Sequence, residues 1–359
     1  MAYMSPKIAN IAGIDIQLHW TFILLLLIAL IAGIGTFVII ILLFVFVVMH
    51  ELSHSIVSLK HYKIPVKKII LFPLGGASII DLENVKPEQG LWIAFAGPLL
   101  SIALSGLFGL AWLYSSGPLS DLLLFSAEIN LLLGIFNLLP AFPLDGGRVL
   151  KSYLEERSDD LSATKKAVTI SKYIIIIFIA GTVAYTVYLT NLSVYDIEIS
   201  LLWDLLIVFF IYTAGQAELQ SAYIKKYTKH IKVSKVMGSN YILVKPSTTM
   251  IALYKLLLSR KTHIVIVRKG HNFALVSRIP INPLNQGTKE MLQKKVTEFA
   301  EEIPSVKESE PLSKAIEIIR YEDAPAVTVT RGGKLVGLLM SEHLETIIAL
   351  HMPQIMGGK

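Results

Sequence analysis

The chain has 359 residues and a formal net charge of +6; 53% of its residues are hydrophobic and only 17% are charged. This composition excludes an ordinary soluble globular protein and indicates a polytopic membrane protein that lies in a lipid bilayer. The positive charge fits the cytoplasmic loops of such a protein, and no arginine-aromatic surface suggests a nucleic-acid partner. Cysteine is absent, so a metal site must use histidine, aspartate or glutamate.

Six apolar segments are long enough to cross the hydrocarbon core of a membrane, which is roughly 30 Å thick. The predicted spans are residues 16–34, 37–59, 91–114, 119–139, 173–189 and 201–223. Lysine and arginine occur in the loops after the second and fourth spans, whereas the loops after the first, third and fifth spans carry neither. The positive-inside rule then places the basic loops and both termini in the cytoplasm.

The second span contains the run VVMHELSHSIV, in which His50, Glu51 and His54 interrupt an otherwise apolar segment. Ionisable side chains are costly inside a bilayer and usually mark a function. Residues four apart on a helix differ by about 40° of rotation and about 6 Å of rise, so both histidines project from one face and can share a metal. His-Glu-x-x-His is also the pattern in which two histidines bind zinc and the glutamate handles a proton. The run predicts hydrolysis inside the membrane, nearer its cytoplasmic side.

A catalytic zinc normally has three protein ligands, so a third ligand is needed. Asp121 lies on the outer side, Glu128 lies near mid-bilayer, and Asp81 and Glu83 fall in a polar loop. Asp145, in the run NLLPAFPLDGGR, follows the fourth span on the cytoplasmic side and is the favoured candidate. Asp-Gly-Gly is equally typical of a tight turn, which leaves a purely structural role for Asp145 open.

Together, the runs HELSH and NLLPAFPLDGG resemble the signature motifs of the site-2 protease family of intramembrane metalloproteases, which cleave membrane-spanning segments of other proteins. The resemblance implies that His50, His54 and Asp145 bind one zinc ion and that Glu51 is the catalytic base. It also implies that Asn137 helps to hold the substrate or the oxyanion. The alternative role of Asn137 is to brace the end of the fourth span.

Residues 69–78, IILFPLGGAS, are apolar but too short to cross the membrane, and Pro73, Gly75 and Gly76 break the run. Irregular backbone at membrane depth is tolerated where its polar groups are paired or line a wet cavity. The segment resembles the membrane-associated strand of the site-2 protease family. It could pair with an extended substrate, because a helix hides its peptide bonds; a simple interfacial hairpin is the alternative.

From about Tyr227 the sequence becomes charged and mixed, with an internal repeat of roughly 60 residues. Residues 248–279 and 312–350 each predict the order helix, strand, strand, helix, which resembles a tandem pair of CBS domains. Such domains often bind adenine nucleotides. The aspartate that usually holds the ribose is replaced here by Pro280 and His343, so dimerisation or a structural contact is an equal alternative to nucleotide binding.

The predicted fold class is therefore a polytopic α-helical membrane domain at residues 1–225, with about six transmembrane helices and a membrane-associated β-hairpin or strand. An α/β cytoplasmic tandem CBS domain, which could form a homodimer, follows at residues 226–359. The predicted activity is that of a zinc metalloendopeptidase acting on transmembrane segments of membrane-protein substrates. A CBS-gated transporter or channel would not need both motifs, and an inactive homologue that only binds membrane proteins would not need intact catalytic positions.

Overall fold

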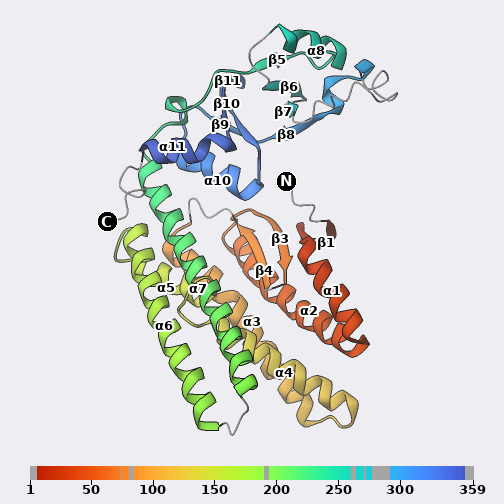
Figure 1. The fold of residues 1–359 in the computed structure, drawn as a ribbon, viewed down its shortest axis with the longest axis vertical. Coiled ribbons are helices and arrows are strands. Elements are labelled where there is room, and N and C mark those ends of the chain that lie inside the picture. The colour runs from red at the N-terminus through yellow and green to blue at the C-terminus, as the bar shows by residue number, and fades with distance from the viewer. Residues whose placement is uncertain are drawn as a thin grey trace. The chain divides into compact units, whose positions relative to one another are not determined.

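The computed structural model describes residues 6–351 except 74, 81–84, 190–193, 260–263, 271 and 277–291, and it describes the backbone but not the side chains of residues 183, 186–189, 194–203, 321 and 351. The chain forms two compact units, Met1–Tyr223 and Ile224–Lys359. Figure 1 shows the helices of the first unit and the mixed helices and strands of the second. We call Met1–Tyr223 the membrane unit and Ile224–Lys359 the repeat unit.

The membrane unit is built from long apolar helices. Among the described residues, four helices are long and apolar enough to cross a membrane: residues 34–61, 87–113, 118–137 and 204–228. In the first of these, a π-helix, Val57–His61, continues α2 without a break. The helices are α1 (Trp20–Ala32), α2 (Ile34–Ile56), α3 (Pro87–Leu113), α4 (Pro118–Asn137), α5 (Asp145–Glu155), α6 (Asp160–Leu189) and α7 (Val194–Thr228), the last of which continues into the repeat unit.

The first predicted span, residues 16–34, is not one helix. Residues Ile14–Leu18 form a strand in which the buried Ile14 and Ile16 alternate with the less buried Asp15 and Gln17. This alternation has the period of two that is expected of a strand. Only the 13 residues of α1 are helical, and at 1.5 Å per residue they extend about 20 Å, which is less than the thickness of a hydrocarbon core. The predicted span at residues 173–189 lies within α6, partly outside the described side chains.

A four-stranded sheet lies in the membrane unit, with the strand order β1-β2-β3-β4. The β1–β2 and β3–β4 pairs are antiparallel, and β2 and β3 are parallel. The membrane-associated hairpin or strand predicted at residues 69–78 is present as the antiparallel pair β3–β4, whereas the two N-terminal strands were not predicted. The strands are β1 (Lys7–Ile11), β2 (Ile14–Leu18), β3 (Val66–Phe72) and β4 (Gly75–Ile80).

One face of this sheet packs against α1 and α2. Ile16 of β2 and Ile69 and Leu71 of β3 form a buried apolar cluster with Phe22 of α1 and Phe44 of α2. β4 contacts α2 beyond this cluster, toward the end of the helix that carries the histidines (Figure 1). Packing of the apolar face against α2 therefore brings β4 next to the HELSH run.

The repeat unit contains two βαββ repeats. In each repeat the first strand is parallel to the second and the second is antiparallel to the third. The first repeat consists of β5 (Ile242–Val244), α8 (Met250–Leu258), β6 (Val265–Lys269) and β7 (Asn272–Val276). The second consists of β9 (Ser305–Lys307), α10 (Leu312–Glu322), β10 (Ala326–Arg331) and β11 (Lys334–Met340). Two further elements are β8 (Ala300–Ile303), which pairs with β7, and α11 (Leu344–His351).

The helix-strand-strand core of each predicted repeat is present, and the strands β5 and β9 precede it. Both are three residues long, too short to produce a periodic pattern in the sequence. The predicted second helix of the first repeat, including Pro280, falls outside the described residues. The two repeats share a buried cluster that joins Phe273 and Leu275 to Ala326 and Leu338.

Candidate metal centre

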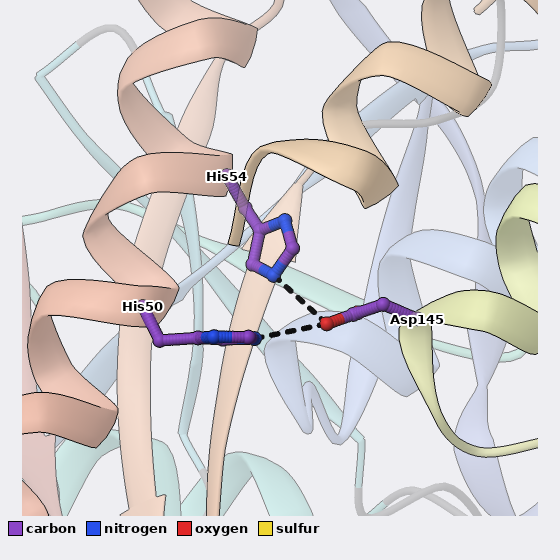
Figure 2. A group of neighbouring side chains, drawn as sticks. All are labelled: His50, His54 and Asp145. Atoms are coloured by element: carbon purple, nitrogen blue, oxygen red, sulfur yellow. Dashed lines mark hydrogen bonds and ion pairs between the residues drawn. The ribbon is translucent and has the colours of Figure 1, made fainter. Parts of the chain in front are cut away.

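His50 and His54 lie one turn apart on α2 and both are buried, with relative exposures of 3% and 5%. Their ring centroids are 5.0 Å apart and the rings are steeply inclined to each other, at 77°. Figure 2 shows both imidazoles directed away from α2 toward the same point. This is the arrangement that the four-residue spacing predicts for a helix.

Asp145 approaches this point from the other side, as the first residue of α5. Its Oδ2 atom lies 2.9 Å from His50 Nε2 and 3.2 Å from His54 Nε2 (Figure 2). The Gly-Gly pair that follows allows the start of α5 to pack closely, because a Cβ atom at Gly147 would lie 2.7 Å from the carbonyl carbon of Ala141. The fold thus brings Asp145 to the histidines across more than ninety residues of sequence.

The three side chains fit a zinc ion in both chemistry and spacing. Each offers one ligand atom, and all three atoms lie within 4.8 Å of one another. Two ligand atoms that are each 2.0 Å from a tetrahedral zinc are about 3.3 Å apart. The two nitrogen-to-oxygen distances, 2.9 and 3.2 Å, are close to this value. Two imidazoles and one carboxylate leave a fourth position open for a water or a substrate.

Helix α3 provides a hydrogen-bond partner for the Nδ1 atom of each imidazole. His50 Nδ1 lies 2.9 Å from the hydroxyl oxygen of the buried Ser101, and His54 Nδ1 lies 2.6 Å from the carbonyl oxygen of Ile93. A carbonyl only accepts, so the His54 ring donates from Nδ1 and its Nε2 is left to bind a metal. Ser101 and Ile93 are not recognisable from the sequence, because a single hydroxyl and a backbone carbonyl belong to no motif.

Gly97 of α3 lies directly against the two rings. A Cβ atom at this position would lie 2.6 Å from His50 Nε2 and closer still to His54 Nε2. A side chain here would displace the nitrogens that face Asp145. The absence of a side chain at Gly97 therefore makes room for these two nitrogens, which is a stricter requirement than the close packing of helices through small residues.

Glu51 lies beside this cluster but is not one of its three members. Ser78 of β4 donates a hydrogen bond to Glu51 Oε2 over 2.7 Å. The glutamate is half-buried and follows His50 on α2, so its carboxylate lies about 100° around the helix from that ligand. This position suits a residue that accepts a proton near a metal without binding the metal itself.

Asn137 is the last residue of α4 and is half-buried. Its Nδ2 donates to the carbonyl oxygen of Leu133, 2.8 Å away and one turn earlier in the helix. This bond corresponds to the bracing role. Of the alternative carboxylates, Glu128 is exposed on α4 and Asp121 is exposed at the start of that helix, whereas Asp81 and Glu83 fall outside the described residues.

The chain is similar to known proteins over the segments that carry these residues. The model of peptidase family M50 matches residues 38–118 and 112–182, which include both histidines, Glu51 and Asp145. The zinc metalloprotease MJ0392 of Methanocaldococcus jannaschii is 31% identical over 348 residues, which is 93% of this chain and 93% of the relative. The chain belongs to peptidase family M50. This M50 protein is an intramembrane metalloprotease.

Solved structures give two further similarities to parts of the M50 protein. The site-2 protease from Methanocaldococcus jannaschii is 33% identical and covers 60% of this chain and 95% of that chain, with a TM-score of 0.45. A hemolysin-like protein of Oenococcus oeni PSU that contains a CBS domain is 16% identical and covers 36% of this chain and 95% of that chain, with a TM-score of 0.28.

Proposed function

We propose that His50, His54 and Asp145 bind one catalytic zinc ion and that Glu51 is the base of an intramembrane endopeptidase. The observation that carries this proposal is the convergence of three ligand atoms from α2 and α5 within 4.8 Å, in a unit of apolar helices. Bound zinc would acidify a water molecule and polarise the carbonyl of the scissile peptide bond.

The protein's own residues would then supply the proton transfers. Glu51 takes the proton of the attacking water and passes it to the leaving amine. Its hydrogen bond with Ser78 holds the carboxylate in place while the other oxygen accepts the proton. Asn137 would stabilise the oxyanion or the substrate backbone through its second amide N–H, since only one of the two N–H groups of Nδ2 donates to the Leu133 carbonyl.

The proposed substrates are transmembrane segments of other membrane proteins. A helical segment hides its peptide bonds, so it must become extended before hydrolysis. Among the described residues β4 is an edge strand, because it pairs with β3 and no other strand. Its hydrogen bond to Glu51 places this edge next to the proposed base, where an extended substrate could pair with it.

The test measures zinc content and cleavage of a model single-span substrate by the purified full-length protein. Glu51→Gln is expected to retain zinc and lose cleavage, because it removes the base and leaves the three ligands. Asp145→Ala is expected to lose zinc as well as cleavage. Full activity in Glu51→Gln would refute the proposed mechanism.

For the repeat unit we propose a cytoplasmic tandem CBS domain at residues 226–359 that regulates the protease, and binding of an adenine nucleotide is the specific hypothesis. His343, at the ribose-aspartate position of the second repeat, is exposed in a single 3-10 turn, Ser341–His343. Titration with ATP and AMP, followed by binding heat and cleavage rate, tests the nucleotide. Absence of both responses would leave dimerisation, measured by sedimentation equilibrium in detergent, or a purely structural contact as the role of the repeats.

A further inference from the structure

Two serine hydroxyls connect the carboxylate of Glu51 to strand β4. Ser55 lies one turn after Glu51 on α2 and is fully buried, and its hydroxyl donates to Ser78 Oγ over 3.2 Å. The Ser78 hydroxyl in turn lies 2.7 Å from Glu51 Oε2 and 3.3 Å from the backbone oxygen of Glu51. Because a hydroxyl has one proton to donate, the shorter contact with the charged oxygen is the favoured bond. The chain of hydrogen bonds therefore runs from Ser55 through Ser78 to Glu51.

The backbone of β4 also touches the aliphatic part of Glu51. A Cβ atom at Gly76 would lie 2.6 Å from Glu51 Cγ and 3.1 Å from Cδ. Gly76 and Ser78 are two residues apart, so they lie on the same face of the strand, while Ala77 between them is exposed. Strand β4 thus contacts both the aliphatic part and the carboxylate of the Glu51 side chain.

We propose that Ser78 is a positioning residue for Glu51: its hydroxyl, oriented by Ser55, holds Oε2 and leaves Oε1 to accept the proton of the attacking water. The inference rests on the proposed role of Glu51 as the base. It adds that correct packing of β4 on α2 is a condition for proton transfer, so the sheet takes part in assembling the catalytic site.

Ser78 is needed because a general base must be held close to the group that it deprotonates. The oxygen of the base must lie within about 2.6–3.2 Å of the atom that carries the proton, and a glutamate side chain has several rotatable bonds that can move its carboxylate away. The Ser78 bond and the Gly76 backbone together restrict those rotations. Loss of comparable supporting hydrogen bonds in metal sites costs roughly 10- to 100-fold in activity or metal affinity.

The test uses the full-length protein and a single-span model substrate in detergent micelles. Ser78→Ala is expected to lower kcat by about 10- to 100-fold, with zinc content and KM within about twofold of wild type. Ser78→Thr retains the hydroxyl and is expected to recover most of the rate. Ser53→Ala is the matched control, because it removes a hydroxyl of α2 that donates to the Ala96 carbonyl of α3 over 2.9 Å.

A double-mutant cycle separates positioning of Glu51 from general support of the fold. Glu51→Asp withdraws the carboxylate from Ser78 by one methylene, so Ser78→Ala is expected to have little further effect on kcat in that background. The infrared difference spectrum between each protein and its Glu51→Gln counterpart isolates the Glu51 carboxylate band. This band is expected to shift in Ser78→Ala and not in Ser53→Ala.

The failures of the two proposals are distinguishable. If Glu51→Gln retains full cleavage, the proposed role of Glu51 fails, and the positioning role of Ser78 fails with it. If Glu51→Gln is inactive but Ser78→Ala has wild-type kcat and an unshifted carboxylate band, only the inference on Ser78 is overturned. Equal losses from Ser78→Ala in the wild-type and Glu51→Asp backgrounds also overturn it.

Discussion

His50 Nδ1 lies 2.9 Å from the hydroxyl oxygen of Ser101, which is 1% exposed and lies 51 residues later in the chain. The contact joins α2 to α3 on the side of the imidazole that faces away from Asp145. It therefore fixes the orientation of a proposed metal ligand without touching the metal itself.

We expect Ser101→Ala to weaken zinc binding by roughly 10- to 100-fold, since the His50 ring loses the partner that orients it. A competition titration against a zinc-binding chromophore measures this change. Ser105→Ala, one turn further along the same helix, is the matched control and is expected to bind zinc like the wild type. An unchanged zinc affinity in Ser101→Ala would show that packing alone orients His50.

We expect Gly97→Ala to reduce both zinc content and cleavage severely, because the added Cβ would lie 2.6 Å from His50 Nε2. The control is Gly106→Ala on the same helix, where an added Cβ meets no atom within 4 Å among those described. Zinc content per protein, measured by atomic emission, distinguishes the two variants. Normal zinc content in Gly97→Ala would contradict the close approach of α3 to the two imidazoles.

Removal of zinc by a chelator is expected to lower the thermal unfolding midpoint of the membrane unit and to abolish cleavage. A ligand that binds the folded state and not the unfolded state stabilises it by about 2.7 kcal/mol at a hundredfold excess over its Kd. Glu51→Gln should show the same drop in midpoint as the wild type, because its three ligands remain. Asp145→Ala should show a much smaller drop, and an equal drop would argue against Asp145 as a ligand.

Asp323 ends α10 with a left-handed backbone conformation, φ 50° and ψ 36°. A β-branched side chain is strongly disfavoured there, so Asp323→Val is expected to destabilise the repeat unit by roughly 1–2 kcal/mol. Asp323→Gly adopts this conformation freely and is expected to be close to neutral. Hydrogen exchange of α10 and β10 in the full-length protein measures both effects. Equal protection in the two variants would contradict the strain argument.

The sequence by itself determined the membrane class, most of the helices and which side chains are candidates for the site. Periodicity and spacing are local properties: His50 and His54 share a helix face because they are four residues apart. The apolar lengths of α2, α3, α4 and α7 predict membrane spans without knowledge of their neighbours. Recognition of Asp145 needed the second motif, because one aspartate before two glycines is also typical of a turn.

The tertiary structure decided how these local elements meet. Approach of α5 to α2 brings Asp145 Oδ2 to the histidines, and packing of α3 supplies Ser101, the Ile93 carbonyl and the space at Gly97. The predicted span at residues 16–34 includes the end of β2, because Ile16 and Leu18 are apolar and lie just before the apolar helix α1. The contact between Ser78 and Glu51 depends on which face of β4 packs against α2, and no spacing in the sequence specifies that choice.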